Sequence, residues 1–592
     1  MTFLRRLWRT ITKPVYLPFF DKAEDTYNAL SKAGQGLFMF LTAVLMLSAA
    51  ALVYQLNDRL IVAIPGYGGG LTEGVVGSPR FINPLLAVSD ADRDLSTLVY
   101  SGLLRATQEG EYVSDLAESY QVSPNGLEYT FTLRTDATFH DGTPVTADDV
   151  LFTVNKTQDP LIKSPARANW SGVLTEALDQ HTIRFTLKSA YAPFVQNATL
   201  GILPKHLWQE VSSEEFPFSD LNTSPIGSGP FKVSDIARTA SGIPSAYALS
   251  AFGGYTLGKP YFSYINLKFF QSEAALAQAL SSGIVEAASG LSPEVLPPSS
   301  EVSVLRAPLN RVFGVFFNQN QSEVLRDLDT RRALESSIDR DTLVSLVLQG
   351  FGTPLSGPIP PDILPGNTAA TDTAPTAVAT SSDRAFAAKK ALIAKGWKES
   401  ADGTLSKTTG KGASAKTVTF AFSLSTGNVP ELRAAAEYLR QEWTKAGAAV
   451  EVKIFDQGDL SQNVIRPRKY DALLFGEVVG RELDLFAFWH SSQRNDPGLN
   501  VALYANATAD RVLEQLRGTS DDQERLKLYN QFVAELRKDI PAVFLYAPDF
   551  VYSIPKDIIG IKLGFIETPS DRFLSVSSWH RETDYVWPLF GR

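Results

Sequence analysis

The chain has 592 residues, more than one hydrophobic core usually serves, so we expect two or three lobes. Its net charge is −9, and residues 36–592 hold 49 basic against 61 acidic side chains. This acidic body excludes nucleic acid as a partner, because phosphates require a basic footprint. Cysteine is absent, which excludes disulfides, thiol nucleophiles and a lipid attached to a cysteine.

An apolar stretch without charge follows the first 35 residues, which carry six Lys or Arg and three acids. Its core, 36–56, is close to the ~20 residues that a helix needs to cross a bilayer. The alternative is a cleaved signal peptide, since the small residues 48–51 offer a cleavage site for signal peptidase. However, the apolar run exceeds the roughly 7 to 15 residues of a signal core. We therefore expect an uncleaved single-pass anchor in the cell membrane. Because the basic residues precede the span, residues 1–35 would be cytoplasmic and the body extracytoplasmic, either periplasmic or at the cell surface.

A strand, a tight turn and a capped helix are predicted in succession within the segment 116–154. Apolar and polar residues alternate over 127–133, the period of a strand with one buried face. Asp141–Gly142 predicts a turn. Thr146 is followed by Asp149 at the spacing at which a hydroxyl and a carboxylate satisfy free N–H groups at a helix start.

This ordered set of residues resembles the signature of the family 5 solute-binding proteins, the oligopeptide-, dipeptide- and nickel-binding receptors of bacterial ABC importers. Other segments that are similar to this family are Asn83–Leu85, Leu98–Leu103, Gly227–Phe231, Asn318, Arg331–Arg340 and Phe488–Ser491. The resemblance covers nearly all of the chain after residue 60.

The resemblance implies an α/β fold of the periplasmic-binding-protein type (type II), with three domains and a cleft between lobes, behind an N-terminal transmembrane helix. The implied boundaries are 58–95, 200–308 and 540–592 for a discontinuous domain I, 96–199 for an inserted domain II and 309–539 for domain III.

Domain III also has a pattern of its own. The sequence predicts a strand over 418–424, a helix that begins at Pro430 and ends before Gly447, and a second strand over 450–454. A strand-helix-strand unit of this kind builds parallel sheets. Another strand is predicted over 470–478, and ligands of such sheets bind near strand ends.

The aromatic and polar segment 473–504 is the expected ligand neighbourhood. A strand ends there, so the following loop can pair with an extended peptide while aromatic side chains form an apolar wall, although aromatics at these positions are also typical of a core. By order along the chain, two aspartates lie in the other loop that lines the family's cleft. The candidate ligand-binding residues are Asp90, Asp92, Asn318, Phe475, Gly476, Glu477, Trp489, His490 and Tyr504.

In one respect the chain departs from the best-known peptide receptors of this family. These receptors hold the ligand's free amine with an aspartate in this loop, where Val479 stands here, and residues 482–484 replace the acidic-Pro pattern that follows. Either Glu477 or Asp484 takes over that role, or the ligand is not a peptide with a free N-terminus.

We expect no cofactor and no metal ion of the protein's own. The five histidines lack the H-E-x-x-H spacing of zinc enzymes, and no G-x-S-x-G is present. A receptor for chelated nickel stays open, with His490 as the first histidine to test. The leading hypothesis is a receptor without catalysis that closes its lobes on oligopeptides or similar solutes and docks on the permease and ATPase subunits of an ABC importer. A transporter-independent peptide chaperone or sensor and a surface hydrolase are the alternatives.

Overall fold

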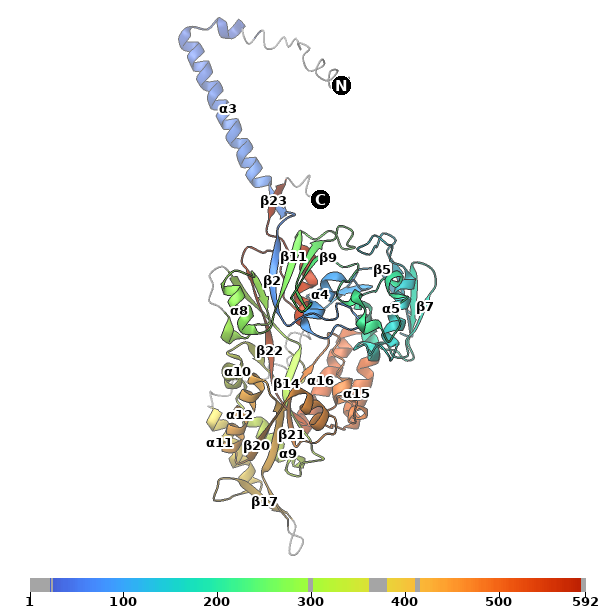
Figure 1. Ribbon diagram of the computed structural model, residues 1–592. Coiled ribbons are helices and arrows are strands. Elements are labelled where there is room, and N and C mark those ends of the chain that lie inside the picture. Colours follow the sequence, from blue (N-terminus) through green and yellow to red (C-terminus); the bar gives the residue numbers. More distant parts are fainter. Residues whose placement is uncertain (1–21, 23–24, 297–301, 361–380, 410–415, 587–592) are drawn as a thin grey trace. The chain divides into compact units, whose positions relative to one another are not determined.

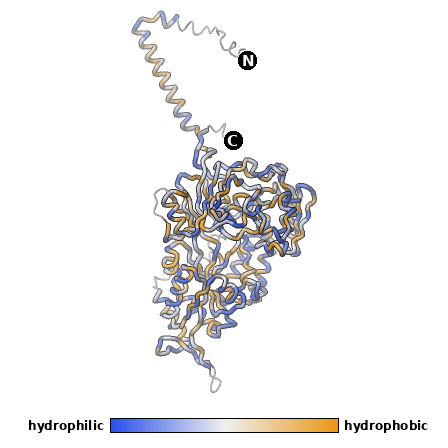
Figure 2. Tube along the Cα trace, in the orientation of Figure 1, coloured by the Kyte–Doolittle hydropathy of each residue, from blue (hydrophilic) through white to orange (hydrophobic). Residues whose placement is uncertain are grey.

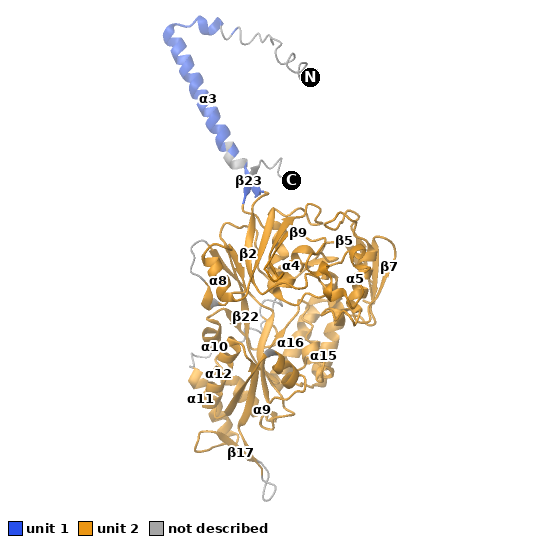
Figure 3. Cartoon of the chain, in the orientation of Figure 1, with its two compact units in different colours: residues 1–66, 582–592 blue, residues 67–581 orange. Residues whose placement is uncertain are grey.

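The computed structural model describes residue 22 and residues 25–296, 302–360, 381–409 and 416–586 (Figure 1). The chain divides into two compact units (Figure 3). The first contains residues 1–66 and 582–592, and the second contains residues 67–581.

In the first unit, helix α3 (Lys32–Leu60) forms over the apolar stretch, as the sequence predicts. Ser31 begins the helix, since its hydroxyl accepts a hydrogen bond from the Gly34 N–H. Residues 32–55 have a mean hydropathy of 2.3 and no buried part, which makes the helix long and apolar enough for a membrane span or a signal sequence (Figure 2). Strand β1 (Val62–Pro65) follows and pairs with β23 (Thr583–Val586), with Val62 opposite Val586.

A 12-stranded mixed sheet runs through the second unit (Figure 1). Its main order is β20 (Ala449–Phe455), β19 (Ala421–Gly427), β21 (Ala472–Val478), β14 (Arg311–Phe317), β22 (Ala542–Pro555), β12 (Ala287–Ser289), β2 (Gly70–Val76), β11 (Tyr264–Phe270), β10 (Pro244–Ala251) and β9 (Phe231–Arg238), while β13 (Val302–Pro308) and β15 (Gly352–Pro354) pair with β22. The first half of β22 pairs with β14 and its second half with β13 and β12. This strand therefore joins the two halves of the sheet.

Helices cover both faces of this sheet at the β14 end. One core packs α9 (Leu328–Ser336), α10 (Arg340–Leu348), α11 (Ser381–Ala394) and α12 (Pro430–Lys445) on one face, and another packs α15 (Ala507–Gly518) and α16 (Asp522–Asp539) on the other. Neighbouring strand residues alternate between them: Val315 and Leu474 belong to the first core, and Phe316 and Leu473 to the second. We call this part the lower body.

The β2 end of the sheet has a core of its own, which includes Leu95 of α4 (Asp90–Val99) and Phe573 of the 3-10 helix η10 (Pro569–Ser578). A small cluster packs α8 (Glu273–Ser281) beside it. We call this part the upper body. Shorter elements elsewhere in the second unit are α6 (Arg167–Trp170), α7 (Lys205–Trp208), α13 (Gln457–Asp459) and α14 (Phe486–Trp489).

A separate four-stranded antiparallel sheet forms the side body, in the order β5 (Ala117–Val122), β6 (Glu128–Leu133), β8 (Thr182–Thr186), β7 (Leu174–Ala177). The alternation predicted for β6 is confirmed, because Tyr129, Phe131 and Leu133 are buried. The predicted helix start is confirmed as well. Thr146 and Asp149 form a capping box at the start of α5 (Ala147–Gln158).

The strand-helix-strand unit β19-α12-β20 is confirmed, with β19 and β20 parallel. The single strand predicted over 418–424 is wrong in one detail, since it is broken into β18 (Lys416–Thr419) and β19. At Phe420 the chain leaves a three-stranded sheet, β16 (Lys398–Glu399), β17 (Leu405–Thr409) and β18, and enters the large sheet. Residues 67–581 form one compact unit, so the division into three domains stays a prediction.

Candidate functional site

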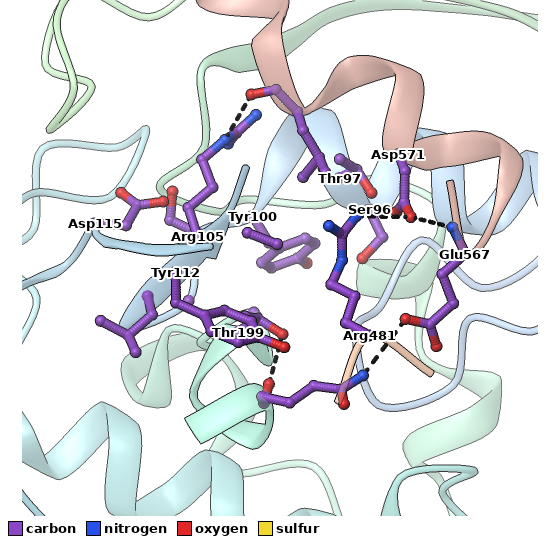
Figure 4. A pocket seen from close by; sticks show the side chains of 17 residues that line it. Ser96, Thr97, Tyr100, Arg105, Tyr112, Asp115, Thr199, Arg481, Glu567 and Asp571 are labelled. Atoms are coloured by element: carbon purple, nitrogen blue, oxygen red, sulfur yellow. Dashed lines mark hydrogen bonds and ion pairs between the residues drawn. The ribbon is translucent and has the colours of Figure 1, made fainter. Parts of the chain in front are cut away.

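A cavity of about 210 Å³ lies where the three bodies meet (Figure 4). The upper body contributes the end of α4 and part of η10. The side body contributes β3 (Leu104–Ala106), β4 (Tyr112–Ser114) and the 3-10 helix η1 (Ala192–Thr199). The lower body contributes Arg481, from the loop that follows β21. Polar and charged side chains dominate the lining.

A buried group of charges holds the upper wall of the cavity in place. Arg572 of η10 is fully buried and contacts Asp94 of α4 at 2.6 Å and Glu73 of β2 at 2.7 Å. Burial raises the pKa of Asp94 to about 6, although the neighbouring Arg572 opposes this shift. The Tyr552 hydroxyl donates to Glu73 at 2.8 Å. Because these groups lock η10 onto α4 and β2, the wall keeps its geometry.

Two side chains tie the side body to η10. Arg105 of β3 donates to the carbonyl oxygens of Phe573 and Leu574, at 2.9 and 3.0 Å, and to the Tyr255 hydroxyl. Gln108 donates to the Asp571 carbonyl at 2.6 Å. Three donors of the Arg105 guanidinium are therefore already satisfied within the protein.

Arg481 joins the lower body to the other two. Its guanidinium donates to the carbonyl oxygens of Thr107 at 2.8 Å and Phe565 at 3.0 Å, and to the Asp571 carboxylate at 3.1 Å. It also lies 4.6 Å from the centre of the Phe565 ring, which adds a cation–π contact. The side chain is 5% exposed, so it acts as a desolvated bridge across the cavity.

A second bridge lies beside the first. The Asp484 carboxylate accepts hydrogen bonds from Tyr191 of the side body at 3.0 Å and from Arg517 of α15 at 2.6 Å. Asp484 was one of the two expected substitutes for the amine-binding aspartate, and these partners already occupy its oxygens. Val479, the residue aligned with that aspartate, is 1% exposed and packs in the core of the lower body.

Two carboxyl groups that line the cavity have raised pKa values. Burial raises the pKa of Glu567 to about 7, and the neighbouring Asp571 adds to this shift. The Gln196 amide donates to the Glu567 carboxylate at 3.4 Å (Figure 4), and a hydrogen bond from the backbone of Arg481 opposes the shift. Burial also raises the pKa of Asp115, which accepts a hydrogen bond from the Thr256 hydroxyl. Carboxyl groups of this kind in a cleft are candidates for ligand contact.

Tyr100 gives a second sign of a binding site. The residue is 5% exposed and lines the cavity, and within the described part of the chain its hydroxyl has no hydrogen-bond partner. A buried hydroxyl without a partner costs free energy unless something else bonds to it. A ligand in the cavity could supply that partner.

None of the nine residues predicted from the sequence lines this cavity. Asp90 is exposed at the first position of α4. Asp92 belongs to the capping box of α4, and its carboxylate also accepts from the backbone N–H groups of Arg80 and Phe81. Asn318 stabilises a turn, where it accepts from the N–H of Gln321.

The predicted aromatic wall lies inside the lower body. Trp489 is 0% and Tyr504 4% exposed, and both belong to the same core. The Tyr504 hydroxyl donates to Asp539 at 2.8 Å. His490 stacks on Phe486, with 4.0 Å between ring centres. In this conformation none of these rings faces the cavity.

The three remaining predicted residues lie on β21. Phe475 packs against the core of the lower body, and Gly476 leaves room for the Phe313 ring, which a Cβ atom would approach to 2.7 Å. Glu477 is 3% exposed, neither of its carboxylate oxygens has a partner among the described residues, and burial raises its pKa well above the usual value. The ligand-binding role of all nine residues stays a prediction.

The residues that do line the cavity escaped the sequence analysis for different reasons. Tyr100 lies in a segment that resembles the family, and Arg481 lies within the expected ligand neighbourhood, but neither has a local pattern that indicates contact with another body. Glu567 is far from both in sequence. No group of three or more metal-binding side chains occurs in the described ranges.

Comparison with known proteins identifies the family of this chain. The family model for bacterial extracellular solute-binding proteins, family 5, middle part, matches residues 111–497. The oligopeptide-binding protein AppA of Bacillus subtilis is 29% identical over 517 residues, which are 84% of this chain and 90% of AppA.

Three solved structures of solute-binding proteins are similar to this chain over most of its length. AppA of Bacillus subtilis in complex with a nonapeptide has a TM-score of 0.66 at 26% identity, over 87% of this chain and 99% of AppA. The ABC transporter substrate-binding protein CtaP of Listeria monocytogenes has a TM-score of 0.71 at 25% identity, over 87% and 100% of the two chains. NikZ of Campylobacter jejuni with Ni(L-His) has a TM-score of 0.66 at 25% identity, over 86% and 99%. The chain has the periplasmic-binding-protein fold and belongs to family 5 of the bacterial extracellular solute-binding proteins.

Proposed function

We propose that this chain is the receptor of an ABC importer, that it binds oligopeptides or similar solutes at the cavity between its three bodies, and that it releases them unchanged. The observation that carries the proposal is the cavity itself. It is polar, it lies where three bodies converge, and it contains the buried Tyr100 hydroxyl, which has no hydrogen-bond partner among the described residues.

The proposed ligand class comes from the relatives. AppA is described as an oligopeptide-binding protein and was solved with a nonapeptide. A cavity of about 210 Å³ is smaller than the ~300 to 1,000 Å³ of common small-molecule pockets, so a peptide requires the bodies to move apart before it enters. Closure then stabilises the complex through contacts that the open form cannot make.

The sheet offers a place for such a movement. Within the described ranges, β22 and the short connection between β13 and β14 carry the chain between the upper and lower bodies at the centre of the sheet. Leu309 in that connection donates its N–H to the Pro548 carbonyl of β22 at 2.9 Å. Two adjacent crossings can act as a hinge. The partners of the closed receptor would be the permease and ATPase subunits of the importer, and the tether to the membrane would be α3.

The proposal is tested with the full chain in lipid nanodiscs and a pool of tri- to nonapeptides, with bound species identified by native mass spectrometry. We expect bound peptides of unchanged mass. The Tyr100→Phe variant, which loses only the hydroxyl, should bind them about three- to tenfold more weakly, because a hydrogen bond contributes about 1 kcal/mol.

Tyr546→Phe is the matched control. Its hydroxyl is also buried without a partner in the described chain, but the residue lies in the core next to α10 and α12 and away from the cavity. If Tyr546→Phe weakened binding as much as Tyr100→Phe, the cavity would not be the site. Cleaved peptides would indicate a hydrolase, and no bound peptide at all would contradict the proposed function.

A further inference from the structure

Strand β20 lies at one end of the 12-stranded sheet. Within the described part of the chain it pairs with β19 alone, so its other side is an open edge. The two strands are parallel over the whole length of β20. An open edge presents backbone N–H and C=O groups with which a further strand can pair.

The direction of these backbone groups follows from the hydrogen bonds to β19. At one end of β20 the Ala449 N–H donates to the Phe420 carbonyl, and at the other end the Phe455 carbonyl accepts from the Asn428 N–H, both at 2.8 Å. Because the backbone direction alternates along a strand, the odd-numbered residues of β20 point their backbone groups at β19. The even-numbered residues point theirs at the open edge, and they are Val450, Val452 and Ile454.

The side chains of β20 are arranged symmetrically about Val452. Glu451 and Lys453 flank it on one face of the strand, where they are 72% and 44% exposed and lie 3.3 Å apart. Val450 and Ile454 lie on the other face, and Ile454 is 47% exposed. A second copy of the strand, antiparallel and centred on Val452, places each Glu451 opposite a Lys453. It also places each Val450 opposite an Ile454.

The same register satisfies the free backbone groups. In an antiparallel pair, opposite residues that point their N–H and C=O groups at each other exchange two hydrogen bonds. This holds for the two copies of Val452 and for each pair of Val450 with Ile454. Glu451 and Lys453 then form the other type of pair, in which the Cα atoms are about 4.5 Å apart and the side chains are closer. Opposite charges at such positions stabilise a strand pair, and like charges destabilise it.

We propose that β20 is a self-association surface, at which two copies of this chain pair antiparallel about Val452 and continue the sheet from one copy into the other. A lysine on an edge strand commonly opposes pairing, but here Glu451 stands at the position that compensates Lys453. A parallel pairing in register is disfavoured, because it would bring like charges together.

The surroundings of the edge agree with this assignment. A shallow hollow of about 460 Å³ lies over β19 and β20, and its lining includes Ser423, Glu451 and Lys453. The described residues therefore leave this side of the strand accessible. None of the residues of β20 lines the cavity between the three bodies, so the inference stands independently of the proposed function.

The test uses the full chain in detergent and measures the share of dimer by native mass spectrometry over a range of protein concentrations. The wild type should form a dimer whose share rises with concentration. Glu451→Lys and Lys453→Glu should each weaken dimerisation by about tenfold or more, because each variant alone brings only like charges together. A mixture of the two variants, one of them isotope-labelled, should form a heterodimer, because every pair across the strands is then again of opposite charge.

Two further measurements check the specificity and the register. Glu109→Lys changes the net charge by the same amount at an exposed pair with Lys562, and it should dimerise like the wild type. Because the chain has no cysteine, Glu451→Cys and Lys453→Cys each introduce a single thiol. Under mild oxidation a mixture of these two variants should form a disulfide-linked dimer. Each variant alone places its thiols at diagonal positions about 7 to 8 Å apart, which is too far for a disulfide.

The proposal would be overturned if the wild type stayed monomeric at every concentration. It would also be overturned if the mixture of Glu451→Lys and Lys453→Glu formed no heterodimer while both variants unfolded at the temperature of the wild type. A disulfide-linked dimer of Glu451→Cys by itself would indicate parallel pairing and contradict the register. None of these results bears on peptide binding, which is tested separately.

Discussion

At the scale of single residues, buried ionisable groups differ in whether they have partners of opposite charge. Arg572 is surrounded by two carboxylates and by the Pro569 carbonyl, so its charge is compensated in the absence of water. Glu477 has no such partners, and burial is the one cause of its raised pKa. The first arrangement stabilises the wall of the cavity. The second costs stability near neutral pH, because the group must take up a proton to stay buried.

Glu477→Gln is therefore expected to stabilise the protein, and the gain should depend on pH. A carboxyl whose pKa is raised in the folded state favours folding below its unfolded value of ~4.3, and this contribution is lost as pH rises towards the folded value. The variant should match the wild type at pH 4.5 and exceed it by about 1 to 3 kcal/mol at pH 7.5. Denaturant unfolding of the full chain across this range measures the difference, and a gain that is equal at both pH values would contradict the explanation.

At the scale of elements, the loop after β21 connects the lower body to both of the other bodies. Arg481 and Asp484 in this loop bond to Thr107, Asp571 and Tyr191, which belong to the side and upper bodies. These contacts join separate bodies, so they stabilise the arrangement of the three bodies in this structure. The loop thus helps to set how readily the bodies separate.

Arg481→Ala should shift the chain towards an open form. The substitution removes three hydrogen bonds between bodies, one of which is also an ion pair, and we expect the fold within each body to persist. Small-angle scattering of the full chain in nanodiscs, with the lipid matched out, should give a larger radius of gyration for the protein. Arg466→Ala, which removes an exposed ion pair with Asp496, should leave the radius unchanged. An unchanged radius for Arg481→Ala would show that this bridge does not hold the bodies together.

At the scale of the whole molecule, the apolar helix and the last strand of the chain belong to one unit. β1 follows α3 after a single residue and pairs with β23, so the segment that leaves α3 is tied to the end of the chain. Removal of α3 at a signal-peptidase site would leave this pairing intact, since both strands lie after it. The structure is therefore compatible with an anchor and with a cleaved signal, and length and charge favour the anchor.

We expect the mature protein to keep its full mass of 64.6 kDa and to stay in the membrane fraction after washing with carbonate or high salt. A variant without residues 1–56 should become soluble outside the cytoplasm when it is exported by a cleavable signal. Immunoblots of membrane and soluble fractions measure both. A shorter soluble form of the wild type would show that the helix is a signal peptide.

Local sequence patterns predicted the parts of the fold that depend on neighbours along the chain. The alternation in β6, the Thr146–Asp149 capping box and the β19-α12-β20 unit were all predicted, because backbone periodicity and free N–H groups constrain nearby residues directly. The motifs around them also indicated the family.

The sequence by itself thus determined the fold class, the family and the apolar helix. Only the tertiary structure decided which side chains face the cavity. Trp489 and Tyr504 have the chemistry of a ligand-binding wall, but in the structure they belong to a hydrophobic core. The sequence pattern of an aromatic residue is the same in a core and in a binding site. Arg481 and Glu567 come together only because separate bodies meet there, and no local rule of the chain encodes a contact between residues so far apart in sequence.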